Sequence, residues 1–236
     1  MKKILTNITR SFAAIVFVAL ASSSAYADGL VLLGTNHTQL VPPQSALILH
    51  ARGNSGTETG GVSWNGTSNV TFGDTQTPHN RTFALNEIGI TNASNLGILF
   101  NINEPNGQNK ELVTVDFLVL TAYDSNGNSV FSASLLGAPL TLEQIKGGQG
   151  SNSDYVFGLD SAAAARLQLA LNANPNLRLG LSASISDVQG GQERFSFGGI
   201  AGPPAAVPEP TTMLLLGTGL AGVAAKARKR RKALKE

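Results

Sequence analysis

The stretch from Leu177 to Ile185 alternates without a break between apolar residues and residues that are polar or glycine. Successive side chains of a β-strand point to opposite faces of its sheet, so this period of two predicts a strand with one face in a core and the other in water. The chain must therefore form at least one sheet that is buried on one side.

A second long segment, Leu112 to Leu120, is apolar on both of its alternating faces. Leu118 and Leu120 lie on one face, so we expect an interior strand. The other face would carry Val113, Val115, Phe117 and Val119. Shorter strands are expected at residues 46–50, 70–72, 81–85, 97–102, 130–135, 155–159 and 194–197, and a short turn near residues 142–146. Many short strands separated by Gly, Asn and Pro predict a mainly β fold, an antiparallel β-sandwich of jelly-roll or immunoglobulin-like size.

One short helix is inserted into this pattern. Asp160 or Ser161 can cap residues 162–172, and Asn174 with Pro175 ends them. The apolar face of this helix would consist of Ala163, Leu167, Ala170 and Leu171. We expect the helix to pack across one end of the sheets.

The chain contains no cysteine, and charged residues make up only 14% of it. It therefore cannot hold a disulfide, a thiolate metal site or a cysteine nucleophile. An apolar content of 42% is enough to build a core, so wholesale disorder is not expected. Stability must come from packing, or from a bound ion or partner.

Positive charge is concentrated at the two ends of the chain. Of the 17 Lys and Arg residues, three lie in the first ten positions and seven in the last eleven. Between Asp28 and Pro208, 13 acidic residues outnumber seven basic ones. This acidic body gives no indication of a nucleic-acid partner.

Residues 1–27 have the three parts of a secretory signal peptide. Two lysines open the segment, an apolar run follows from Phe12 to Leu20, and the small residues Ala25 and Ala27 close it. The apolar run is too short to span a bilayer core. We therefore predict export by Sec-type machinery and cleavage after Ala27.

Residues 207–236 combine three unlike elements. The segment opens on Val207, Pro208, Glu209 and Pro210. An uncharged apolar helix is expected at 211–225; its 15 residues would reach roughly 22 Å, which is short for a transmembrane helix. The basic tail at 226–236 includes Lys226, Arg228, Lys229, Arg230, Arg231 and Lys232. These cations would keep the C-terminus in the cytoplasm, so the segment predicts a weak, transient anchor in the inner membrane.

The Pro-Glu-Pro motif, the short glycine-containing helix and the terminal arginine cluster, in this order, resemble the PEP-CTERM sorting signal of Gram-negative bacteria. The resemblance implies recognition by an exosortase, which is a membrane peptidase, and cleavage near the motif. It also implies release or transfer to the cell surface, and an association with biofilm and exopolysaccharide. The body at 28–206 has a fainter likeness to other precursors of this class, which names no activity.

Two features of the body are candidate ligand sites. Trp64 stands between Gly61 and Gly66, where its ring could stack on a sugar, although a lone tryptophan more often anchors a core or loop. Asp124 to Ser129 alternates possible calcium ligands but lacks the glycine and glutamate that an EF-hand loop requires. Asn126–Gly127 fits a hairpin turn better. We therefore expect no cofactor, with calcium as the weaker alternative.

No catalytic residue can be assigned from the sequence. The three histidines, His37, His50 and His79, lack the spacing of a metal site, and most carboxylates are expected in solvated turns. We therefore expect a non-enzymatic surface or matrix protein that acts by adhesion or with exopolysaccharide. The alternative is a carbohydrate-binding or carbohydrate-cleaving domain, which would need exposed aromatic rings or two facing carboxylates. A third possibility is a fibre subunit with an unpaired sheet edge.

Overall fold

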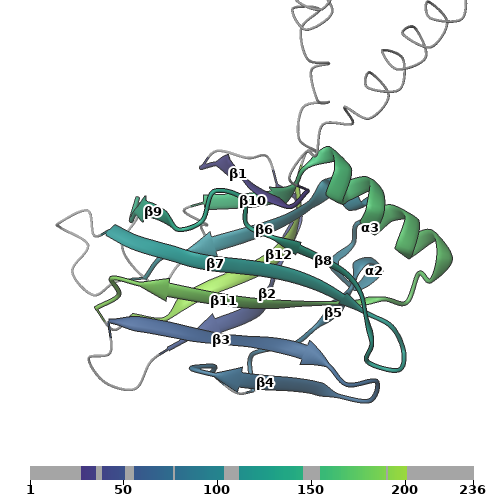
Figure 1. Ribbon diagram of the computed structural model, residues 1–236, viewed down its shortest axis with the longest axis horizontal. Coiled ribbons are helices and arrows are strands. Elements are labelled where there is room, and N and C mark those ends of the chain that lie inside the picture. Colours follow the sequence, from purple (N-terminus) through teal and green to yellow (C-terminus); the bar gives the residue numbers. More distant parts are fainter. Residues whose placement is uncertain are drawn as a thin grey trace, which may run out of the picture.

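The computed structural model describes residues 28–35, 39–50, 56–76, 78–103, 112–145, 155–189 and 191–200. Within these residues the fold is mainly β, with two antiparallel sheets and few helices (Figure 1). The predicted signal peptide and the predicted sorting segment lie outside the described residues. Across the described part of the chain, no helix is long and apolar enough to cross a membrane.

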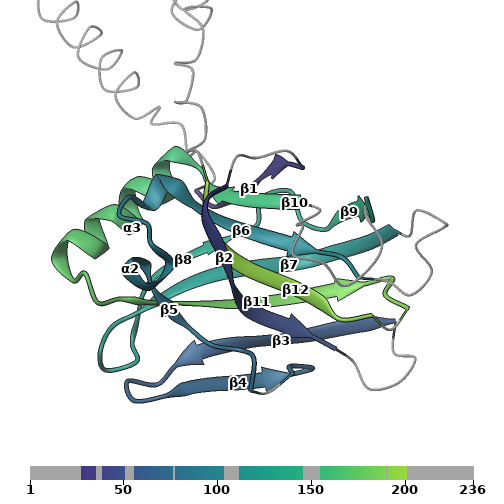
Figure 2. The same cartoon turned by 180° about the vertical axis from the view of Figure 1, so that it is seen from behind.

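The smaller sheet has five strands in the order β1-β10-β6-β12-β2. It is seen from its own side in Figure 2. Its strands are β1 (Leu30–Gly34), β10 (Tyr155–Leu159), β6 (Leu96–Asn101), β12 (Glu193–Ile200) and β2 (Gln39–Leu49). Each pair of neighbours in it is antiparallel, as the sequence predicts.

The larger sheet has the order β4-β3-β11-β7-β8, with β5 beside β11 and β9 beside β7. Its strands are β4 (Asn69–Gly73), β3 (Thr57–Trp64), β11 (Arg178–Ser186), β7 (Leu112–Tyr123), β8 (Ser129–Ser134), β5 (Phe83–Ala84) and β9 (Leu140–Glu143). The alternating segment at 177–185 thus forms β11, and its odd-numbered side chains are buried.

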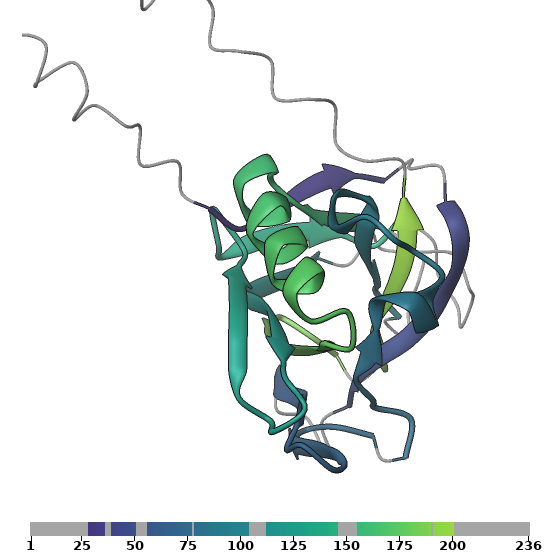
Figure 3. The same cartoon turned by 90° about the vertical axis from the view of Figure 1, so that its right-hand side faces the viewer.

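The two sheets enclose one main apolar core, and Figure 3 shows them facing each other from the side. Both sheets contribute to it, as the strict alternation of β11 requires. From the smaller sheet, Phe100 and Phe195 are fully buried and stack with ring centroids 4.4 Å apart. This arrangement is of the sandwich type that the short strands predict.

The predicted helix is α3 (Ser161–Ala173), and it covers one end of the sheets (Figure 3). The Asp160 carboxylate caps it by accepting a hydrogen bond from the Ala163 amide at 2.8 Å. Leu167 and Leu171 are buried, whereas Leu169 is 69% exposed on the opposite face. Two short helices that the sequence analysis missed are α2 (Leu85–Ile88) and the 3₁₀ turn η1 (Ala93–Asn95).

The alternation of β7 changes phase at Asp116. The register against β11 skips this residue, which forms a β-bulge. Val115 faces the core before the bulge and Leu118 faces it afterwards, so Phe117 lies on the outer side. The prediction of one shared face is therefore wrong for Val113, Val115, Phe117 and Val119. The strand is nevertheless interior, since it pairs with β11 on one side and with β8 and β9 on the other.

Four other segments differ from the sequence prediction. Residues 140–143 form β9, where the sequence suggested a turn near residues 142–146. The expected strand at 81–85 is reduced to the two residues of β5, because the chain turns into α2 at Leu85. The strands β1 and β3 were not predicted, since β3 is rich in threonine and glycine and has no apolar alternation.

Candidate functional site

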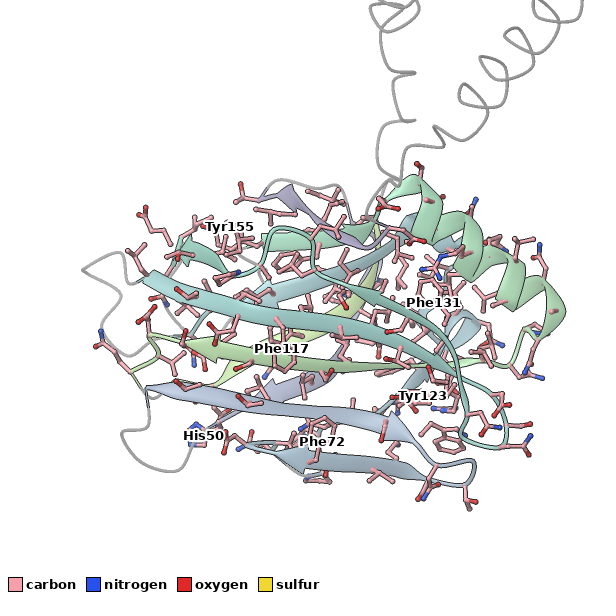
Figure 4. All side chains as sticks on the ribbon, in the orientation of Figure 1. His50, Phe72, Phe117, Tyr123, Phe131 and Tyr155 are labelled. Atoms are coloured by element: carbon pink, nitrogen blue, oxygen red, sulfur yellow. The ribbon has the colours of Figure 1, made fainter. Side chains whose placement is uncertain are left out.

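The outer face of the larger sheet is not covered by another described helix or strand, and Figure 4 looks onto it. We use the term outer face for the side of β4, β3, β11 and β7 that points away from the core. The strand registers place on it Val70, Phe72, Thr59, Gly61, Ser63, Ser182, Ser184, Phe117 and Val119. It therefore combines small hydroxyl side chains with two phenyl rings.

The ring of Phe72 lies against the backbone of the neighbouring strand. A Cβ atom on Gly61 would stand 2.6 Å from Cζ of Phe72 and 2.8 Å from Cβ of Ser182. Only glycine at this position leaves room for the Phe72 ring to pack flat against the sheet. Phe72 nevertheless stays 50% exposed, and Phe117, carried outward by the bulge, is 38% exposed.

A hydroxyl and carboxylate network lies beside Phe117. Asp116 accepts hydrogen bonds from Ser186 Oγ at 2.9 Å and from Ser184 Oγ at 3.3 Å. The Ser184 hydroxyl also contacts the Thr59 hydroxyl at 2.7 Å. The network links three strands and orients polar oxygens beside an exposed aromatic ring. These groups can accept and donate hydrogen bonds next to the exposed face of a phenyl ring.

Trp64, the candidate ligand contact, lies half-buried at the end of β3. The Arg178 guanidinium carbon stands 4.7 Å from the ring centroid, so one face of the indole carries a cation–π contact. Arg178 is itself held by Thr82, with 2.6 Å to its carbonyl and 2.9 Å to its hydroxyl, and by Glu87 at 3.3 Å. The covered face of Trp64 is unavailable to a sugar, and the contact joins β3 to β11.

Two carboxylates are buried inside strands and do not lie in the solvated turns in which the sequence suggested most carboxylates. Glu58 on β3 and Glu193 on β12 are fully buried. Each occupies an inward position of its strand: Glu193 shares the phase of Phe195 and Phe197. The alternation of β12 could have predicted that Glu193 points into the core. The sequence of β3 has no such alternation, so it does not predict that Glu58 is buried.

The histidines are dispersed, and His37 lies outside the described residues. His50 Nδ1 donates to the Gly191 carbonyl at 2.8 Å, and His79 is exposed. Among the described residues, no three His, Asp or Glu side chains gather as metal ligands would. The expectation of no cofactor stays a prediction.

The segment from Asp124 to Ser129 forms the hairpin turn between β7 and β8. Gly127 has the left-handed φ of 82°, and its amide donates to the Asp124 carbonyl at 3.1 Å. The Asp124 carboxylate accepts the amides of Asn126 at 2.8 Å and Asn128 at 2.9 Å. The loop that resembled a calcium site thus uses its aspartate to close the turn.

These hydrogen bonds give the turn a pH dependence. Those from the backbone and side chain of Asn128 lower the pKa of Asp124 below 3.8. Because the folded pKa is depressed, the stabilisation is complete above pH 3.8 and is lost as the pH falls through the lower folded value. We expect Asp124→Ala to lower the urea midpoint at neutral pH. The difference in midpoint between the wild type and this variant should shrink below pH 3.8. Ser125→Ala is the control; a difference for Asp124→Ala that stays constant with pH would contradict this account.

The predicted processing residues cannot be placed in the fold. Ala25 and Ala27 precede the described residues, which begin at Asp28. The motif Val207, Pro208, Glu209 and Pro210, and the basic residues Lys226, Arg228, Lys229, Arg230, Arg231 and Lys232, follow the last described residue, Ile200. Their roles rest on sequence alone.

Comparison with known families supplies independent information on the C-terminal segment. Residues 206–231 match the PEP-CTERM protein-sorting motif. No curated protein and no solved structure matches the chain. The chain therefore carries a PEP-CTERM sorting motif, which marks it as an exported protein that an exosortase sorts.

Proposed function

We propose that this chain is a surface or extracellular-matrix protein whose two-sheet domain acts by adhesion and not by catalysis. The observation that carries the proposal is the sorting motif at residues 206–231, which starts close behind the last strand, β12. Residues 201–205 alone separate the two, so processing near the motif would deliver the whole domain. The precursor would be held transiently at the inner membrane until the exosortase acts.

The outer face supports an adhesive role. It is broad, lies on a sheet fixed by long antiparallel ladders, and presents exposed rings together with hydroxyl groups. The partner that fits the sorting class is the exopolysaccharide of a biofilm.

Removing residues 207–236 tests the sorting step. In a Gram-negative host that has an exosortase, we expect the full chain to yield a shortened surface or released product. The deletion variant should accumulate in a cell fraction other than the surface or the medium. The triple variant Pro208→Ala, Glu209→Ala, Pro210→Ala keeps the apolar helix and the cations, so it separates recognition of the motif from anchoring. Unchanged surface display of the deletion variant would contradict the proposal.

A second candidate function, carbohydrate binding on the outer face, is favoured by Phe117 and its neighbours. The ring is 38% exposed and stands beside the oriented carboxylate of Asp116. The ionisable group of this network is acidic, which favours a neutral glycan over an anionic one. We expect glycan-array binding by the processed protein to be lost in Phe117→Ser and kept in Leu169→Ser, an exposed position on α3. Equal glycan binding by both variants would exclude the outer face as the carbohydrate-binding site.

A further inference from the structure

Four strands end the main strand orders of the two sheets, and one of them differs from the other three. These terminal strands are β1 and β2 in the smaller sheet and β4 and β8 in the larger one, in which the short strands β5 and β9 also pair on one side only. An open edge presents unpaired amide and carbonyl groups that can pair with another chain, so natural proteins protect their edges.

Three of the edges have such protection. Along β2, the Asn80 side chain accepts the Ile48 amide at 2.7 Å and donates to the Ile48 carbonyl at 3.2 Å, as a neighbouring strand would. At β1, the Leu136 amide donates to the Leu30 carbonyl at 2.8 Å. At β8, the helix α3 packs alongside, and Arg166 donates to the Ser132 carbonyl at 3.3 Å.

The strand β4 is the exception among these four terminal strands. None of its five residues is charged, and Val70 and Phe72 are 41% and 50% exposed. No described segment forms a ladder along its outer side. It has no charged residue and no proline, and within the described residues no element covers it, so the usual means of blocking an edge are missing there.

The ladder between β3 and β4 shows which backbone groups face outward. Asn65 donates to the Ser68 carbonyl, and Asp74 donates to the Thr59 carbonyl. Hydrogen-bonded pairs alternate with non-bonded pairs in an antiparallel ladder, so Val70 and Phe72 bond to β3 and Thr71 does not. The amide and carbonyl of Thr71 therefore point toward the open edge.

We propose that β4 pairs antiparallel with β4 of a second copy of this chain, in a register centred on Thr71. In this two-fold register Thr71 exchanges both of its backbone hydrogen bonds with its own counterpart. Phe72 of each copy then stands opposite Val70 of the other, on the same face, and aromatic residues pair well with β-branched ones across strands.

Charge also favours a second copy as the occupant. The body of the chain is acidic, so two copies repel each other over most of their surfaces. The neutral strand β4 is a place where they can approach without opposing like charges. A five-residue strand gives a small interface, so the association is weak and depends on concentration, as suits molecules displayed side by side on a surface.

Cysteine cross-linking tests the register directly, because the chain has no cysteine of its own. Opposed residues of a hydrogen-bonded antiparallel pair have Cα atoms about 5.5 Å apart, within the range of about 4.4–6.8 Å that a disulfide spans. Exported, processed protein from cells expressing the full Thr71→Cys chain should form covalent dimers on mild oxidation. The control is Leu169→Cys. Leu169 is 69% exposed, whereas Thr71 is half-buried, so random collisions alone would cross-link the control faster.

Cross-linking of Thr71→Cys that is no faster than that of Leu169→Cys would overturn the proposal. A cross-link of Thr71→Cys to a different protein would overturn the choice of a second copy as the occupant. Neither result bears on the sorting motif, whose test is the fate of the tail deletion.

A proline at the same position tests the interaction without a cross-link. The Thr71 amide makes no bond to β3, so Thr71→Pro should fold while blocking the edge. We expect at least tenfold weaker self-association by sedimentation equilibrium, with an unchanged thermal midpoint for the monomer. Should Thr71→Pro not fold, Val70→Lys removes the Val–Phe pairs and should weaken association likewise. A wild-type protein that stays monomeric up to about 1 mM would refute the inference.

Discussion

Replacing Phe100 by alanine should lower the free energy of unfolding by about 3–5 kcal/mol, the range for a buried phenylalanine. Phe100 lies on β6 and is fully buried. Its ring stacks on Phe195 at 4.4 Å and lies tilted against Phe157 at 6.5 Å. The substitution removes buried apolar area and two ring contacts, and it leaves a cavity that the flanking strands of the ladder prevent from closing.

Urea unfolding at equilibrium measures this loss. The matched control is Phe117→Ala, which removes the same side chain from the outer face, where 38% of it is exposed. We expect the control to lose about 1 kcal/mol, within the usual range for point mutants. Equal losses for the two variants would mean that the core does not lie between the sheets at Phe100.

The elements that the sequence predicted best obey local rules. The strand β11 follows from its unbroken alternation, and β10 was predicted at the residues it occupies, 155–159. The helix α3 follows from the Asp160 cap and the Asn174–Pro175 stop, both of which lie within the segment itself. No distant residue is needed to specify any of these elements.

The elements that the sequence did not reveal depend on distant partners. In β3, Gly60 and Gly61 give no apolar pattern, but Gly61 is required by the ring of Phe72 from the next strand. The bulge in β7 turns the Asp116 carboxylate toward two serines of β11, some 70 positions later in the chain. Such requirements appear only once the strands are adjacent.

The same distinction applies to the candidate sites. The sorting motif was identified from three elements in a fixed order, all within one terminal segment. Trp64 could be singled out as the lone tryptophan, but the Arg178 side chain that covers it comes from a strand far along the chain. The outer face was not foreseen, because it is assembled from four strands and depends on the phase change at Asp116.

Replacing Asn80 by alanine should lower the free energy of unfolding by about 2–3 kcal/mol, since a buried amide left without its partner typically costs about 1–3 kcal/mol. Asn80 is buried, and both ends of its side chain bond to the backbone of Ile48. After the substitution the Ile48 carbonyl keeps the Gln76 amide at 3.2 Å, but the Ile48 amide loses the bond that Asn80 provides.

The control for this prediction is Asn92→Ala. Asn92, unlike Asn80, is exposed, and its side chain accepts a hydrogen bond from the Ser94 amide at the start of η1. Loss of such a cap should cost about 0.5–1 kcal/mol. A urea midpoint for Asn80→Ala no lower than that for Asn92→Ala would show that the β2 edge does not depend on Asn80.

The Asn80 variant also tests why β4 differs from the other edges. If side-chain pairing is what keeps β2 from binding other chains, removing it should create a second open edge. The double variant Asn80→Ala, Thr71→Pro should then self-associate more than Thr71→Pro alone in sedimentation experiments. If the double variant is no more associated than Thr71→Pro, protection of β2 comes from its backbone bonds to the chain that follows β4, and not from Asn80. These bonds join Arg81 to Ala46 at 3.1 Å, Gln76 to Ile48 at 3.2 Å and His50 to Asp74 at 2.8 Å.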